Sequence, residues 1–406
     1  MKRLFAAAAL LLAAAAASAQ PADSPFLPPL EPTGPADAVF TTEAELARWP
    51  DWRAIETATL QQAELTRGSF SGADGAKIHY RLYRHRAERR GGIVLVSGRT
   101  EGLVLYQELI HDLVRNGYSV YIHDHRGQGF SQRLLADDTS IGYVKEFDHY
   151  VSDLAAFISG PVRTARGEGN KPLYLLAHSM GGAISALYLE RVPRDGVAAA
   201  ALVTPMMEPW VASSADAGIA TRLVDSYCKQ HSRKREGWIG SFLETRYADG
   251  APFDDEYAAL RNAWPGANND LTHSALRFER HWVAQDQARC DGPDCGSPHA
   301  KVGGVSFRWL NQSCMATEQA RGPAARRIAV PVLLLQGERD TVVKPGAQKQ
   351  FCDELNAGNG PGYCVGRRLP QARHALFIES DTYRTPALRR ALGFFDCVGA
   401  GTSRCE

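Results

Sequence analysis

The chain has 406 residues, 44% of them hydrophobic, which is enough for one large domain with an insertion or for two domains. Its 46 Lys and Arg residues nearly balance 45 Asp and Glu residues, so the formal net charge is +1. Because no strong positive field would attract a phosphate backbone, this balance argues against nucleic-acid binding as the main function.

The N-terminus has the pattern of an export signal. Lys2 and Arg3 precede a continuous apolar run, Leu4–Ala17, and residues 17–19 form an A-x-A cleavage site. The run is shorter than the about 20 residues that span a membrane. We therefore expect residues 1–19 to be a cleaved signal peptide and the mature protein to be exported, to the periplasm or outside the cell. A retained signal anchor is the alternative.

A leader and a helical segment follow. Six prolines lie between residues 20 and 36, which predicts an extended, poorly ordered leader over residues 20–40. Thr41–Leu60 is predicted to be helical, with Trp49 and Trp52 packing it against the body. Gly68–Arg84 is predicted to be a hairpin that turns at residues 72–75.

Short apolar strands then alternate with helices. Strands are expected at residues 92–97, 119–123, 172–177, 197–203, 330–335 and 365–369, and helices at 103–116, 147–158 (ended by Gly160-Pro161) and 181–191. Strands that are apolar throughout predict a mostly parallel sheet covered by helices on both faces. The expected fold class is therefore α/β.

The motif at residues 123–131 begins His123-Asp124-His125-Arg126 and contains two glycines. A metal site is the rival interpretation, but neighbouring residues on a strand end point to different sides, and Arg126 would repel a cation. We predict a tight loop at the border of the active site, with Asp124 and Arg126 in a structural network.

Residues 175–182, Leu-Leu-Ala-His-Ser-Met-Gly-Gly, lie between an apolar strand and a helix of small residues. This is the context of a nucleophile elbow, a sharp turn that holds a serine in a strained backbone conformation. The residues two before and two after the serine must be small, as Ala177 and Gly181 are. Ser179 is therefore the candidate nucleophile, and a serine at an ordinary strand-to-helix turn is the alternative.

A serine nucleophile needs a base and an orienting acid. Asp340 follows the strand at 330–335 and is preferred to Glu338 as the acid, because it lies farther into the loop that leads to a helix. His374 lies between the last strand and the final helix, from where it can reach over the sheet edge as the base. A surface loop histidine is the alternative for His374.

An oxyanion hole requires two backbone N–H donors. We expect Met180, the residue after the nucleophile, to supply one and Arg99, in the loop at 97–101, to supply the other. The Arg99 side chain is also a candidate to bind a phosphate or carboxylate of the substrate. The alternatives are that it points to solvent or pairs with Glu101.

The regular alternation stops between Met206 and Pro323, a segment too long for a loop that contains five of the seven tryptophans. We interpret 206–323 as a helical cap inserted between two parts of the core, 41–205 and 324–406. A basic run at 228–235 is a candidate for transient contact with a membrane surface, with a solvated face as the alternative.

An even number of cysteines, eight, in an exported chain predicts disulfide bonds. Proximity in the sequence favours Cys290–Cys295, Cys352–Cys364 and Cys397–Cys405, which leaves Cys228–Cys314. A zinc site is the weaker alternative, because the sequence has no CxxC pair and its histidines show no ligand spacing.

With these residues, the chain resembles the monoacylglycerol lipase and bacterial lysophospholipase group of α/β-hydrolases, from about Leu65 to Phe395. The shared motifs are S-G-R-T-E (97–101), D-H-R-G-Q-G (124–129), A-H-S-M-G-G (177–182), G-E-R-D (337–340) and R-H-A (373–375). Arg99, Ala177 and the segments 131–137 and 271–274 are similar to the lysophospholipase branch.

The resemblance implies an α/β-hydrolase fold, a Ser179–His374–Asp340 triad, oxyanion donors at Arg99 and Met180, and chemistry without a metal or cofactor. We therefore expect a secreted hydrolase that cleaves a small lipid or ester substrate through an acyl-enzyme, as a lysophospholipase or monoacylglycerol lipase. A short-chain esterase or peptidase of the same fold is an alternative. A non-catalytic ligand-binding protein on a hydrolase scaffold is an alternative of a different class.

Overall fold

A computed structural model describes residues 24–31, 34–136, 139–169, 171–192, 196–210, 269–402 and 404–405. About half of the predicted cap (residues 211–268), with Cys228 and the basic run at 228–235, therefore lies outside the described residues, as does the predicted signal peptide. Among the described residues, no helix is both long and apolar enough to cross a bilayer.

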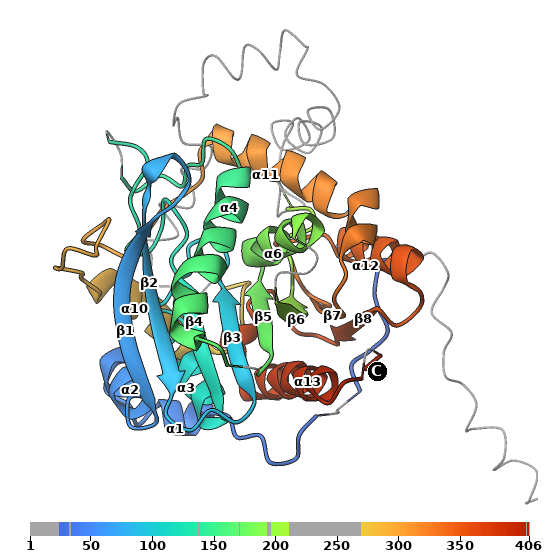
Figure 1. The fold of residues 1–406 in the computed structure, drawn as a ribbon, viewed down its shortest axis with the longest axis horizontal. Helices are drawn as coiled ribbons and strands as arrows, with labels where there is room; N and C mark the ends of the chain where they lie inside the picture. Colours follow the sequence, from blue (N-terminus) through green and yellow to red (C-terminus); the bar gives the residue numbers. More distant parts are fainter. Residues whose placement is uncertain are drawn as a thin grey trace, which may run out of the picture.

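An eight-stranded sheet forms the centre of the molecule (Figure 1), in the order β1-β2-β4-β3-β5-β6-β7-β8. The first two neighbouring pairs are antiparallel and the other five are parallel. The strands are β1 (Ala63–Ser71), β2 (Lys77–His85), β3 (Gly91–Val96), β4 (Tyr118–His123), β5 (Leu173–His178), β6 (Val197–Val203), β7 (Val332–Gly337) and β8 (Cys364–Leu369). The predicted α/β class with a mostly parallel sheet is confirmed.

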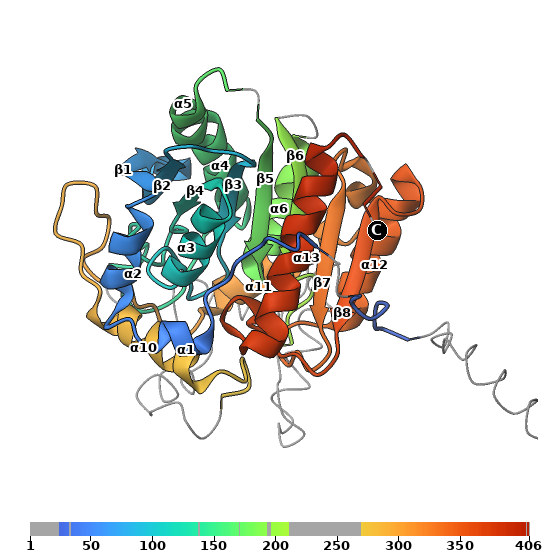
Figure 2. The same cartoon turned by 90° about the horizontal axis from the view of Figure 1, so that it is seen from below.

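Helices cover both faces of the sheet (Figure 2) because successive side chains of each buried strand point to opposite faces. Val94 and Val96 of β3 pack with one face, and Ile93 and Leu95 with the other. The first face is covered by α4 (Asp148–Phe157), α6 (Met180–Arg191), α11 (Phe307–Ala320) and α12 (Pro345–Asn359), and the second by α3 (Gln107–Arg115) and α13 (Asp381–Gly399). Further elements are α10 (Ala275–Gln287) and the short helices η1 (Ala73–Gly75), η3 (Pro323–Arg327) and η4 (Leu376–Ile378).

The prediction of one continuous helix over Thr41–Leu60 is wrong. Two short helices, α1 (Glu43–Leu46) and α2 (Trp52–Thr59), flank Pro50, and Asp51 caps the second by accepting a hydrogen bond from the backbone of Ala54. A proline lacks the N–H that a continuous helix needs, so the chain restarts the helix after it.

The predicted helix stop at Gly160-Pro161 is also wrong. The helix α4 continues through the π-helical stretch η2 (Ile158–Val162) into α5 (Arg163–Arg166), and ends at Gly167, which has φ 58°. The wider turns of a π-helix accommodate the proline without ending the helix.

The leader, predicted to be extended and poorly ordered, instead packs against the body over residues 24–31. Leu27 is 6% exposed and its backbone N–H donates to Gln336. The Leu30 N–H donates to the carbonyl of Arg368, and the Arg368 N–H to that of Pro28, so this segment lies along the edge strand β8. Composition alone did not reveal these tertiary contacts.

Three of the predicted disulfides are present: Cys290–Cys295, Cys352–Cys364 and Cys397–Cys405. Cys314 is also disulfide-bonded, while its predicted partner lies outside the described residues.

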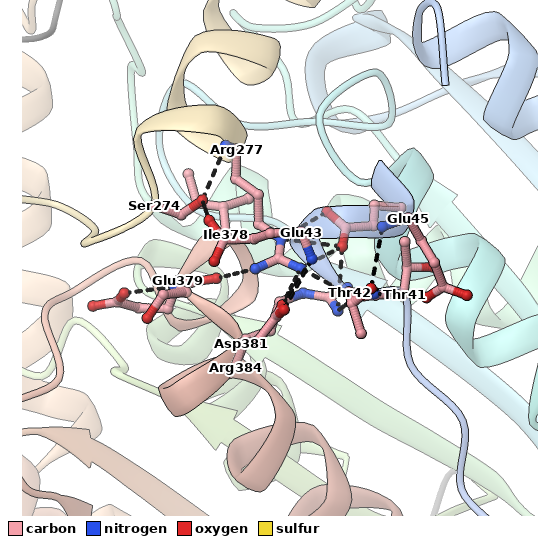
Figure 3. A network of polar contacts seen from close by, with 12 residues as sticks. Thr41, Thr42, Glu43, Glu45, Ser274, Arg277, Ile378, Glu379, Asp381 and Arg384 are labelled. Carbon is pink, nitrogen blue, oxygen red and sulfur yellow. Dashed lines mark hydrogen bonds and ion pairs between the residues drawn. The ribbon is translucent and has the colours of Figure 1, made fainter. Parts of the chain in front are cut away.

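A buried network of charged groups joins four helices far apart in the sequence (Figure 3). Arg277 of α10 donates to Glu108 of α3, to Asp381 at the start of α13 and to the backbone carbonyls of Thr41 and Glu379. The Glu43 N–H of α1 also donates to Asp381, at 2.9 Å. This network fixes the start of α13, which follows the His374 loop after the short helix η4.

Candidate active site

Ser179 lies at the turn between β5 and α6. Its φ is 51° and its ψ is −119°, a conformation that residues other than glycine rarely adopt. A Cβ at Gly181 would lie 2.2 Å from the carbonyl oxygen of Val96 and 2.5 Å from that of Ser97, so only glycine lets α6 approach β3 so closely. The strained turn has the geometry that the sequence predicts for a nucleophile elbow.

The structure brings the three predicted side chains into one hydrogen-bonded row. His374 Nε2 lies 3.0 Å from Ser179 Oγ, and His374 Nδ1 lies 2.7 Å from Asp340 Oδ2. All three side chains are buried. They come from the segments after β5, β7 and β8, because the carboxyl ends of parallel strands meet at one edge of the sheet.

Asp340, and not Glu338, is the carboxylate that contacts His374. Its second oxygen, Oδ1, accepts the backbone N–H groups of Val342 and Val343, at 2.8 and 3.0 Å, which fixes the carboxylate. Glu338 instead pairs with Arg368 and accepts the backbone N–H of Gln371.

A second buried carboxylate, Glu379, holds the loop that carries His374. Glu379 accepts the backbone N–H of Arg373, at 3.0 Å, and the backbone N–H of His273, at 2.9 Å. The Ala375 N–H donates to the carbonyl of Leu271. The segment 271–274 therefore positions the loop that carries His374, a role that the sequence motif alone did not indicate.

The loop that carries Arg99 begins beside the elbow, since Val96 of β3 pairs with Ala177 of β5. Met180 is the first residue of α6, next to Ser179. The Arg99 guanidinium donates to the carbonyl of Gly303, at 2.9 Å, and its carbon lies 5.6 Å from the ring centroid of Trp309. Arg99 thus contacts the segment that leads into α11.

Asp124 and Arg126 form the predicted structural network. Asp124 accepts the backbone N–H groups of Leu103 and Phe130, at 2.9 and 2.7 Å. Arg126 donates twice to the buried carboxylate of Asp153, both at 2.7 Å. These contacts fix the loop that borders the elbow.

Two residues without a predicted role complete the site. Glu101 Oε2 lies 2.9 Å from Nδ1 of His178, the residue before Ser179, and accepts from the Tyr106 hydroxyl and the Gly98 N–H. Both residues lie within sequence motifs that were identified as part of the site. Because side chains alternate along β5, His178 points to the opposite face of the sheet from the neighbouring Ala177.

The contact between Glu101 and His178 lowers the pKa of the glutamate and raises the pKa of the histidine. Burial would raise the pKa of Glu101, but the His178 charge and hydrogen bond, with the hydrogen bond from Tyr106, lower it to about 2. Burial would lower the pKa of His178, but the charge and hydrogen bond of Glu101 outweigh it and raise the pKa above its ordinary value.

Comparison with known proteins gives a consistent result. The profile of the family described as "Serine aminopeptidase, S33" matches residues 87–381. Lysophospholipase L2 of Escherichia coli is 37% identical over 337 residues, which cover 80% of this chain and 86% of that protein. The probable lysophospholipase L2 of Haemophilus influenzae is 26% identical, covering 80% of this chain and 90% of that one.

Solved structures share the fold. The monoglyceride lipase of Saccharomyces cerevisiae, crystallised with a substrate analog, superposes with a TM-score of 0.57 at 18% identity, covering 81% of this chain and 94% of that chain. A carboxyl esterase from Bacillus coagulans gives a TM-score of 0.56 at 16% identity, covering 82% and 99%.

Proposed function

The chain belongs to the serine aminopeptidase S33 family of α/β-hydrolases, and from that premise we propose that it is a secreted lysophospholipase with Ser179 as nucleophile, His374 as base and Asp340 as orienting acid. The observation that carries the proposal is the row of two hydrogen bonds, 3.0 and 2.7 Å long, through the His374 ring. This arrangement activates a serine hydroxyl without any group beyond the chain itself.

The proposed reaction is acyl transfer in two steps. Ser179 Oγ attacks the ester carbonyl carbon while His374 Nε2 takes its proton, and the backbone N–H groups of Arg99 and Met180 stabilise the oxyanion. His374 then protonates the departing alcohol, and a water molecule repeats the sequence on the acyl-enzyme. Asp340 keeps the second ring proton on Nδ1 and stabilises the imidazolium.

A lysophospholipid is the proposed substrate because the relative at 37% identity over most of both chains is named a lysophospholipase. The Arg99 guanidinium supports it as well, since a cation beside the oxyanion loop suits a headgroup phosphate. A monoacylglycerol, which lacks the phosphate, is the second candidate, because monoglyceride lipases share the fold. We propose that the insertion over residues 206–323 supplies the cap over the acyl chain, while its last helix, α11, packs on the sheet.

The test measures release of fatty acid or alcohol from four substrates: lysophosphatidylcholine, a monoacylglycerol, p-nitrophenyl acetate and an aminoacyl amide. We expect lysophosphatidylcholine to give the highest kcat/KM, and folded Ser179→Ala protein to lose nearly all activity on every ester. Cleavage of the amide alone would favour a peptidase. Normal turnover in Ser179→Ala would refute the proposed nucleophile.

A non-catalytic scaffold is the alternative of a different class. A fluorophosphonate probe distinguishes the two, because it labels only an activated serine. We expect labelling of the wild-type chain and none of Ser179→Ala.

We also propose export, supported by the disulfide bonds and by the cleavage pattern at residues 17–19. Fractionation of cells that express the full chain, with N-terminal sequencing of the exported form, tests it. Recovery of the uncleaved chain in the membrane fraction would favour the retained anchor.

A further inference from the structure

The ring of His178 lies between two groups that act as hydrogen-bond acceptors. Nδ1 is 2.9 Å from Glu101 Oε2, and Nε2 is 3.1 Å from the backbone carbonyl oxygen of His374. A carbonyl oxygen can only accept, so Nε2 must carry a proton. The state of Nδ1 depends on whether Glu101 is a carboxylate or a carboxylic acid.

The contacts of Glu101 favour the carboxylate. One oxygen, Oε2, receives the Gly98 N–H at 2.6 Å, the Tyr106 hydroxyl at 2.5 Å and the His178 ring at 2.9 Å. A proton on Oε2 would compete with these donors, and a proton on Oε1 would leave Oε2 a neutral carbonyl oxygen, which accepts more weakly than a carboxylate oxygen. Three donors at these short distances therefore favour the carboxylate. Nδ1 of His178 must then donate as well, and a ring that donates from both nitrogens is an imidazolium.

We propose that Glu101 and His178 form a permanent buried ion pair that positions the catalytic base, through one line of hydrogen bonds from the oxyanion loop to the backbone of His374. The inference rests on the proposed triad and assigns both residues as positioning residues, since neither touches the reacting atoms.

The line joins the three segments of the proposed site. Glu101 holds the N–H of Gly98, next to the proposed oxyanion donor Arg99. His178 directly precedes Ser179, and the carbonyl of His374 accepts from His178 and from the Thr204 hydroxyl, at 2.8 Å. The backbone of the base is therefore fixed from two neighbouring strand ends, β5 and β6.

The ion pair also limits the electrostatic effect of a cation near the base. The ring centroids of His178 and His374 are 4.9 Å apart. A bare imidazolium there would oppose the positive charge that His374 acquires in the reaction, and Glu101 neutralises it. Among the described residues, the titratable groups facing the pair include Tyr106, His125, His281 of α10, Asp340 and His374 itself.

The first test is spectroscopic and uses the full chain with 15N-labelled histidine at about pH 8.5. At that pH an ordinary histidine is neutral. We expect one resonance with both ring nitrogens protonated, which Glu101→Gln and His178→Gln each remove. A singly protonated His178 ring in the wild type would overturn the proposal, whether or not the chain hydrolyses any ester.

The second test is a double-mutant cycle on p-nitrophenyl acetate. We expect Glu101→Gln and His178→Gln each to lower kcat by about 10- to 100-fold, the loss typical of a misplaced catalytic group, with little change in KM. The double variant should be no worse than either single variant, because the two residues act as one unit.

Glu190→Gln, a buried carboxylate in α6 outside the site, is the matched control and should keep wild-type kcat. Melting curves establish that each variant is folded. Wild-type kcat in Glu101→Gln, or independent multiplicative losses in the double variant, would refute the coupled role. If the wild type neither turns over esters nor binds the fluorophosphonate probe, the proposed function fails, while the protonation state of His178 is still decided by the first test.

Discussion

At the scale of single residues, Asp340 is tested by Asp340→Asn. An asparagine amide in place of the carboxylate can donate to His374 Nδ1, which moves the ring proton to Nε2, where it blocks acceptance of the proton from Ser179. We expect kcat/KM to fall by about 10⁴-fold with the fold intact. The matched control is Glu338→Gln, two residues earlier, which contacts Arg368 and Gln371 instead of the base. Equal losses in the two variants would argue against the assigned acid.

A second prediction at this scale concerns Glu190, which is 2% exposed. Burial raises its pKa to about 7, and nearby Gln319 and Arg327 oppose the rise only in part. Between about pH 4.5 and 7 the folded chain holds a proton that the unfolded chain has released, so this group makes the free energy of unfolding fall as pH rises. Above pH 7 the Glu190 side chain is ionised in the folded chain, and the full free-energy cost of burying this charge, about 3 kcal/mol, lowers the stability.

Glu190→Gln should therefore be more stable than the wild type above pH 7, and the advantage should shrink toward pH 4.5. Urea unfolding of both chains across this range measures the difference in the free energy of unfolding. The contributions of the other titrating groups cancel in this difference because both chains share them. A pH-independent difference would show that Glu190 does not titrate as inferred.

At the scale of elements, the buried network in Figure 3 predicts a large effect of Arg277→Met. The side chain is 1% exposed, and its loss leaves the buried carboxylate of Glu108 and the partly exposed carboxylate of Asp381 without this partner. Removing one member of a buried ion pair typically costs about 3–5 kcal/mol. Arg289→Met, an exposed arginine just beyond the same helix, is the control and should cost little. Chemical denaturation measures both, and similar stabilities would contradict the structural role of the network.

Some helices, strands and site residues could be predicted from the sequence, and others could not. The apolar strands, the turn at Ser179 and the meeting of Ser179, His374 and Asp340 were predictable because each depends on a local pattern or on the carboxyl ends of parallel strands. The helix break at Pro50 and the π-helical turn at Pro161 depend on how a proline is accommodated, which propensity alone did not resolve. Glu101, His178 and the His374 carbonyl were missed as a group because they are 77 and 196 residues apart and meet only in the folded chain.

At the scale of the whole molecule, the leader protects one edge of the sheet. The exposed side of an edge strand such as β8 can pair with another chain, and natural proteins cover such edges. Here residues 28–30 exchange backbone hydrogen bonds with Arg368 of β8, and Leu27 packs against Gly366, where an added Cβ would lie 2.7 Å from the Leu27 side chain. The leader follows the expected cleavage site and would therefore remain in the mature protein.

We accordingly expect Leu27→Asp to detach this segment, because a carboxylate cannot occupy the buried site of a leucine. The variant should lose about 3 kcal/mol of stability, as is typical when a buried leucine is lost, and should self-associate through the freed edge of β8. Denaturant unfolding and light scattering measure the two effects, with Pro25→Asp, an exposed position in the same segment, as the control. Lost stability without self-association would mean that the leader contributes packing but does not shield the edge, whereas wild-type behaviour in both measurements would show that its contacts with β8 contribute little.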